Sequence, residues 1–233
     1  MLTVYTAVTR GYDHLARAPQ GVRCLAFVED LSVDPNGWEL RPLSGEAPDP
    51  VRRAKRYKVL PWEVLPADTD CSLWLDGSVV CGAHVDLEAL AARCLATSDL
   101  VTRRHPGRDC AYSEADEVLR LRLDDPDVVR AQMERYRRAQ YPRRNGLAEA
   151  GILLRRHSDH VIHQTIAWWD EIERGSRRDQ LSFDYSCRLT GVRYTVLSPS
   201  DASGFSMRPH ARSMAAPPGA RTGTILDYIY QRK

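Results

Sequence analysis

Short apolar runs alternate along the chain with longer stretches of helical periodicity, and this alternation restricts the folds open to it. The runs are rich in β-branched and aromatic residues and end at turn residues, a pattern typical of strands. They predict strands at residues 2–9, 24–30, 71–75, 99–106, 150–156 and 194–197. Helices are predicted at residues 49–60, 86–96, 113–123, 126–140, 159–174 and 178–189. Such alternation predicts an α/β fold with a largely parallel central sheet.

The chain is long enough for one large domain followed by a tail. It has 233 residues, 43% of them hydrophobic, which suffices for a sizeable core. From about Ser198 the composition shifts to Ser, Pro, Ala, Gly and Arg, with few apolar residues to pack. We therefore expect a domain at 1–195 and a flexible tail or active-site flap at 196–233, with a segment at 224–231 that docks back.

Charge and hydropathy exclude several classes of protein. Lys and Arg number 33 against 31 Asp and Glu, a formal charge of +2, so no nucleic-acid footprint is expected. No apolar run reaches the roughly 20 residues of a membrane span, and the first residues do not resemble a secretory signal. The expected location is the cytoplasm. The 6 cysteines lack zinc-finger spacing and are expected to be buried thiols.

The run "CSLWL" at 71–75 ends in a carboxylate, Asp76, followed by Gly77. Ligands of open α/β sheets bind beyond the carboxyl ends of the strands, where Gly77 allows close approach of the backbone. A carboxylate there can hold Mg or Mn next to phosphates. The alternative is an ordinary Asp-Gly turn, which the spacing alone favours. The acidic pair of 68–70 precedes the strand and is predicted to be a surface turn.

Basic residues follow one face of the helix predicted at 49–60. Lys55 and Lys58 are three residues apart and therefore share a face, with Arg53 close by. Cationic side chains at such a place can meet a diphosphate and offset the charge of a leaving group. A solvated basic face is the alternative.

Several stretches occur in an order that resembles one known family. They include "VYTAVTRGYDHL", "RRAKRYKVLP", "SLWLDGSV", "HPGRDCAYSEADEV", "YPRRNGLAEAGILLRRH" and "WWDEIERGSRRDQLSFDY". Over roughly residues 1 to 190 the chain resembles the TOD1/MUCI70 glycosyltransferase-like family. The resemblance implies a GT-A-like fold with a Rossmann-like, mixed and mostly parallel central sheet flanked by helices. It also implies a nucleotide-sugar donor and a hydroxyl acceptor.

The resemblance assigns a donor site to the first strand and to Asp76. Tyr5, Thr6, Thr9 and Gly11 match the family's stretch where a GT-A fold seats the base and ribose. Asp76 matches the position where many GT-A enzymes carry Asp-X-Asp for a metal and the diphosphate. The third position here is Ser78, whose hydroxyl is a weaker ligand than a carboxylate. A divalent metal, Mn or Mg, is therefore one way to position the diphosphate, and water is the other.

Two carboxylates are candidates for the acceptor's base. Transfer to a hydroxyl with inversion needs one base to take its proton. Asp179 begins the "RDQLSF" stretch, and Glu149 precedes the strand at 150–156. The resemblance favours Asp179 with Gln180, because Asp-Gln pairs occur at this place in other GT-A enzymes. Helix capping is the alternative explanation of Asp179.

Four further residues are assigned to the acceptor or the pocket. His105 and Glu114 match the family's His and Glu positions between the sheet and a helical insert, although helix capping also explains Glu114. His157 follows a predicted strand, and His160 and His163 are assigned to structure because no HExxH pattern occurs. Trp169 is expected at the pocket wall, with core packing as the default.

The sequence therefore predicts a GT-A-like glycosyltransferase that moves a hexosyl or pentosyl group from a nucleotide-diphosphate donor to a hydroxyl acceptor. Asp76 positions the diphosphate, and Asp179 or Glu149 orients or deprotonates the acceptor. Two alternatives stay open. One is a nucleotide-sugar-binding domain without turnover, suggested by Ser78. The other is a hydrolase in which Asp76 and histidines hold a metal that activates water.

Overall fold

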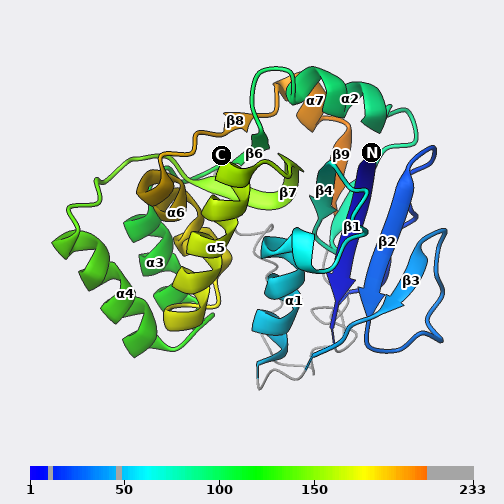
Figure 1. Ribbon diagram of the computed structural model, residues 1–233. Coiled ribbons are helices and arrows are strands. Elements are labelled where there is room, and N and C mark those ends of the chain that lie inside the picture. The colour runs from blue at the N-terminus through cyan, green and yellow to red at the C-terminus, as the bar shows by residue number, and fades with distance from the viewer. Residues whose placement is uncertain (10–12, 46–48, 209–233) are drawn as a thin grey trace.

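Seven strands form one mixed sheet in the computed structural model, which describes residues 1–9, 13–45 and 49–208 (Figure 1). Their order is β3 (Glu39–Pro42), β2 (Arg23–Val28), β1 (Leu2–Val8), β4 (Cys71–Leu75), β7 (Ala148–Arg156), β6 (Leu100–Arg104) and β8 (Thr195–Val196). β7 runs antiparallel to β4 and β6, and every other pairing is parallel. The predicted α/β fold with a mixed, mostly parallel sheet is confirmed. Because β7 is reversed, its beginning lies with the ends of β4 and β6.

Six helices of the described residues flank the sheet, and three of them begin at an aspartate cap. They are α1 (Pro50–Val59), α2 (Leu87–Cys94), α3 (Ala111–Arg120), α4 (Pro126–Arg138), α5 (Asp159–Arg174) and α6 (Phe183–Thr190), with short turns η1 (Pro61–Glu63), η2 (Asp179–Leu181) and α7 (Pro199–Ala202). Asp49, Asp86 and Asp125 each accept a hydrogen bond from a backbone N–H of the first turn that follows. A proline at the first position fixes the backbone of α1 and α4.

Alternation along the strands divides the core into two faces. Leu73 of β4 and Leu154 of β7 pack on the face covered by α2. Their neighbours Trp74 and Leu153 pack on the other face, together with Trp168 of α5. A third, tyrosine-rich cluster joins α3, α4 and α6, which Figure 1 shows at the end of the molecule opposite β2 and β3. The sheet is thus covered on both faces, as parallel strands require.

Two helix boundaries differ from those predicted. The helix expected at 113–123 begins at Ala111, because Cys110 is already in the extended conformation that precedes a helix. The helix expected at 178–189 is divided at Ser182, where η2 ends and α6 begins. Asp179 therefore lies in a tight turn that packs beside β7 and α3.

The first part of the expected tail is packed on the domain. β9 (Phe205–Met207) pairs antiparallel with β5 (Val79–Cys81) in a second, two-stranded sheet, and α7 precedes it. Phe205 is buried in the core on the α2 face. Three paired residues and one aromatic ring suffice to fix this segment, although its composition is poor in apolar residues. Residues 209–233, with the expected docking segment at 224–231, lie outside the described residues.

None of the helices in the described part of the chain combines the length and the apolar composition that crossing a bilayer requires.

Phe205→Ala should lower the free energy of unfolding by about 3 kcal/mol, because it opens a cavity under α2. Chemical denaturation followed by circular dichroism measures the difference. Ser206→Ala, at the neighbouring exposed position of β9, is the matched control and should leave stability unchanged. Equal stability of Phe205→Ala and the wild type would contradict the packed position of this segment.

Candidate active site

Asp76 occupies the edge of the sheet at the end of its central strand, as the sequence predicts. It follows β4, and its backbone N–H donates to Gly151 O at 2.8 Å. Its carboxylate is one-third exposed, with Oδ1 accepting from Trp74 Nε1 at 2.6 Å. A Cβ at residue 151 would lie 3.2 Å from Asp76 Oδ2, so the glycine leaves room for this carboxylate. Oδ1 is therefore fixed by its partners, and Oδ2 lies beside Gly151.

Lys58 lies between Asp76 and Asp179. Its ammonium nitrogen is 2.7 Å from Asp179 Oδ2 and 3.3 Å from Asp76 Oδ1, and its side chain is only 2% exposed. Lys55 Nζ is 3.0 Å from Asp179 Oδ1. The two lysines share one face of α1, as their spacing predicts, and this face meets η2 and the end of β4. The result is a four-residue charge cluster at the edge of the sheet.

Burial and charge inside the cluster shift the pKa values of Asp179, Asp76 and Lys58. Burial raises the pKa of Asp179, but the charges of Lys55 and Lys58 outweigh burial and hold it well below its ordinary value. Burial also raises the pKa of Asp76, and Lys58 and Lys55 again bring it below the ordinary value. For Lys58, burial lowers the pKa and the two carboxylates raise it above the ordinary value. All three groups are therefore charged at neutral pH.

Tyr5 supports Lys58 and does not face a ligand. Its hydroxyl donates to Lys58 O at 3.0 Å, and it accepts a hydrogen bond from Arg155. Arg155 also donates to Lys58 O at 2.6 Å, at the end of α1 where backbone carbonyls lack helical partners. Tyr5 is fully buried and Thr6 is 2% exposed, so neither side chain is open to solvent in this structure, and their assignment to the donor site stays a prediction. β1 is paired with β2 on one side and β4 on the other, and α1 packs against it.

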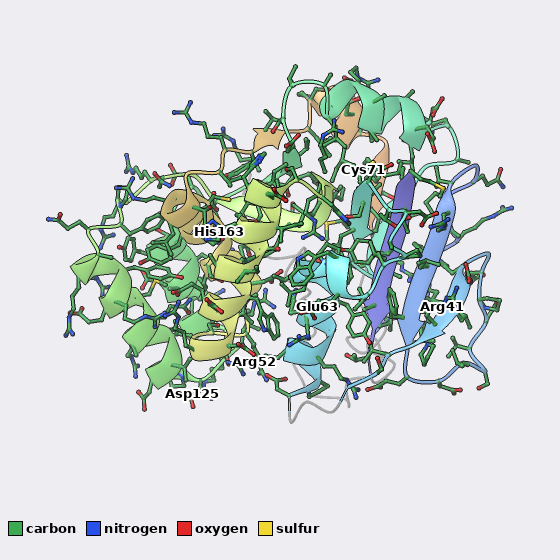
Figure 2. All side chains as sticks on the ribbon, in the orientation of Figure 1. Arg41, Arg52, Glu63, Cys71, Asp125 and His163 are labelled. Carbon is green, nitrogen blue, oxygen red and sulfur yellow. The ribbon has the colours of Figure 1, made fainter. Side chains whose placement is uncertain are left out.

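Other contacts fix α1 against α5. Arg52 donates to Gly175 O at 2.6 Å and to Ile172 O at 3.2 Å, and Figure 2 shows it between the two helices. Arg53, on another side of α1, pairs with Glu29 after β2. Arg53 is therefore at the same edge of the sheet but does not join the charge cluster.

Of the other first-strand candidates, Thr9 is half-buried just beyond β1, at the same edge of the sheet as Asp76. Gly11 lies outside the described residues. Gly77 is tightly enclosed, since a Cβ there would lie 3.0 Å from the Asp13 side chain.

Glu149 lies inside β7, at the beginning that faces the same edge. Its Oε2 is buried without a hydrogen bond among the described residues, and Arg103 is 3.8 Å away. Burial raises the pKa of Glu149, and Asp76 adds to this shift while Arg103 opposes it. Gln180 is used structurally, because its Nε2 donates to Ala148 O at 3.1 Å and ties η2 to β7.

His105 and Glu114 lie near each other, and Arg108 contacts both of them. His105 Nδ1 accepts from the N–H groups of Gly107 and Arg108, and Arg108 Nε donates to Glu114 Oε2 at 2.5 Å. Burial, with the Arg108 charge, lowers the pKa of His105 to about 4, so the ring is neutral. The cluster shapes the loop after β6 at the edge shared with Glu149.

His157 and Trp169 lie elsewhere. His157 follows the end of reversed β7, so it is beside the start of β4, marked by Cys71 in Figure 2, and its Nε2 is 2.9 Å from Ser72 Oγ. It lines a cavity of about 620 Å³ at that opposite edge. Trp169 packs against Arg56, whose guanidinium carbon is 5.6 Å from the ring centre. The neighbouring Trp168 contacts the site instead, donating to Asp179 O at 3.0 Å.

The described residues do not fit a divalent metal at this edge. Ser78 is 1% exposed, and its Oγ is buried without a partner, so it cannot ligate an ion beside Asp76 in this conformation. Asp76 Oδ1 is already taken by Trp74 and Lys58. Within residues 1–9, 13–45 and 49–208, no group of three His, Cys, Asp or Glu side chains is arranged to hold a metal.

Arg208 is a candidate that sequence reasoning missed. It directly follows β9, where its N–H donates to Ser78 O at 2.9 Å and its Nη2 donates to Gly77 O at 2.9 Å. The guanidinium is thus anchored by one donor beside Asp76, and four donors are left for other acceptors. The signal that could have found it is the short alternation "FSM" in the expected tail.

Asp179→Asn should destabilise the protein by about 3 kcal/mol near pH 7, because two lysines lose a buried partner. The pKa of Asp179 is lower in the folded than in the unfolded chain, so its contribution is complete above about pH 4 and declines as pH falls below that value. Chemical denaturation at several pH values from 7 to 3 should therefore show that the free energies of unfolding of Asp179→Asn and the wild type approach each other in acid. Asp127→Asn, a carboxylate that is 90% exposed, should follow the wild type throughout.

Comparisons with known proteins give a family and two partly similar structures. Mouse Xyloside xylosyltransferase 1, in its apo form, aligns with a TM-score of 0.48 at 12% identity over 84% of this chain and 84% of that one. The galactosyltransferase LgtC, in complex with donor and acceptor sugar analogs, aligns with a TM-score of 0.47 at 16% identity over 83% of this chain and 73% of that one. No curated protein matches the sequence. The sequence model of the TOD1/MUCI70, glycosyltransferase-like domain matches residues 47–197, and the chain belongs to that family.

Proposed function

We propose that the protein transfers a sugar from a nucleoside-diphosphate donor to a hydroxyl acceptor at the edge of the sheet beyond β4. The observation that supports this most directly is the charge cluster of Asp76, Asp179, Lys55 and Lys58. Buried carboxylates and amines with shifted pKa values gather at functional sites more often than elsewhere. Their place beyond the ends of parallel strands is also where such sheets bind ligands.

The donor's phosphates would lie between Lys55 and Arg208. Lys55 is partly exposed at the rim of the cluster, and Arg208 is anchored to the loop that carries Asp76. Both cations can stabilise the charge that develops on the departing diphosphate. Oδ2 of Asp76, whose Oδ1 is already bonded to Trp74, would accept a hydrogen bond from a hydroxyl of the donor. Asp179 would keep both lysines in place.

Glu149 would act as the base toward the acceptor. The transfer breaks the bond between the anomeric carbon and the diphosphate oxygen, which leaves with the electron pair. It forms a bond from that carbon to the acceptor oxygen, whose proton passes to the Glu149 carboxylate. Glu149 has a raised pKa and only the more distant Arg103 beside it at 3.8 Å, whereas two lysines at 2.7 and 3.0 Å make Asp179 a weak base.

Donor binding is tested by thermal shift with UDP, GDP, CDP and their sugars, with and without manganese. One nucleotide should raise the melting temperature by about 5 °C at a hundredfold excess over Kd. Asp76→Ala should abolish this rise. Asp68→Ala removes an exposed carboxylate that precedes β4 and should respond like the wild type. No shift with any nucleotide would contradict the proposed function.

Glu149→Gln should reduce transfer about 100-fold or more, because a positioned base typically contributes that much. Its donor-induced thermal shift should be unchanged. In the wild type, transfer should fall as pH drops through the raised pKa of Glu149, since only the ionised form accepts a proton. Glu173→Gln, on the exposed side of α5, is the control. Donor binding without product for any acceptor would favour a binding domain instead.

A further inference from the structure

We propose that the ammonium group of Lys58 takes the place of a divalent metal in this site, so that donor binding does not depend on Mn²⁺ or Mg²⁺. This inference concerns the cofactor requirement. Only its test with nucleotides rests on the proposed function, whereas its test with Mn²⁺ alone does not.

The position of the Lys58 nitrogen carries the argument. It lies 3.3 Å from a carboxylate oxygen of Asp76 at the end of β4 and 2.7 Å from one of Asp179 on η2. Two carboxylates converging from separate elements are the ligand type that Mg²⁺ and Mn²⁺ prefer. Here the point of convergence holds a permanent cation attached to α1.

The surrounding contacts keep that cation in place. Tyr5 and Arg155 bind the backbone carbonyl of Lys58, and the Lys58 ammonium also lies 5.9 Å from the centre of the Trp74 ring. The side chain is almost fully buried, so it cannot swing into solvent to admit a metal without a change in the end of α1. An ion entering between the carboxylates would also meet the repulsion of the ammonium at close range.

The charge that a metal would bring to a diphosphate is supplied by other side chains. Lys55 is partly exposed beside Asp179, and Arg208 is held on Gly77 O with donors to spare. Arg208 is anchored on the residue that follows Asp76, and Lys55 contacts Asp179 in the same charge cluster. Lys58 therefore balances the two carboxylates, and the other two cations are left for the phosphates.

The test compares the wild type, Lys58→Met and Arg56→Gln. Binding of Mn²⁺ alone is measured at pH 7.5 from the electron paramagnetic resonance signal of the free ion. The wild type and Arg56→Gln should bind no Mn²⁺ above background. Lys58→Met removes the ammonium but keeps a side chain of similar length, so it should bind Mn²⁺ about tenfold or more tightly than the wild type, since the carboxylates lose their cation. Arg56, paired with Glu63 on the exposed side of the same helix, is the matched control.

The second arm measures Kd by calorimetry for the nucleoside diphosphate that stabilises the wild type most, in EDTA and in Mn²⁺. Equal Kd values in the two buffers are expected. A wild type that binds Mn²⁺, a Kd that needs Mn²⁺, or a folded Lys58→Met without Mn²⁺ binding would each overturn the inference. If Lys58→Met does not fold, the two wild-type measurements decide. Failure of every nucleotide to bind would remove the proposed function, whereas the Mn²⁺ measurement would still decide the role of Lys58.

Discussion

A buried ammonium group is tolerated only where negative groups compensate its lost hydration, and Lys58 meets this condition through two carboxylates from different elements. Each partner is fixed in turn. Gly151 O holds the backbone of Asp76, and Trp168 together with Gln180 fixes the turn that carries Asp179. Buried ion pairs are seldom more stabilising than apolar packing of the same volume. The stability that this cluster contributes therefore does not by itself account for it, which agrees with the donor site that we propose there.

Local patterns in the sequence predicted the parts of the site that depend on one element. The spacing of Lys55 and Lys58 predicted that they share a helix face. The apolar run before Asp76 predicted that this carboxylate lies at the end of a strand. The direction of a strand is not a local property, because pairing decides it. The reversal of β7 brings Glu149 to the candidate site and takes His157 to the opposite edge. The burial of Tyr5 was not predictable for a similar reason, since it comes from elements distant in the sequence.

Composition was a poor guide to residues 197–208. A tail was expected there because few apolar residues are available, yet the backbone bonds of β9 to β5 and one buried ring at Phe205 hold it on the domain. Such pairing joins residues far apart in sequence, so the short alternation "FSM" indicates a strand but does not reveal its partner. Arg208 escaped notice for that reason. Its position follows from the strand before it.

The contacts within the charge cluster are all non-local, and this has a consequence for folding. Lys55 and Lys58 meet Asp179 across more than half of the chain, and Arg208 reaches Gly77 over a separation of 131 residues. Contacts of this kind form only when the strands of the sheet have paired, because the entropy of closing long loops opposes them earlier. No partly folded intermediate or fragment of the domain would present the site. A ligand bound there would report on the folding of the whole domain, and would stabilise it as one cooperative unit.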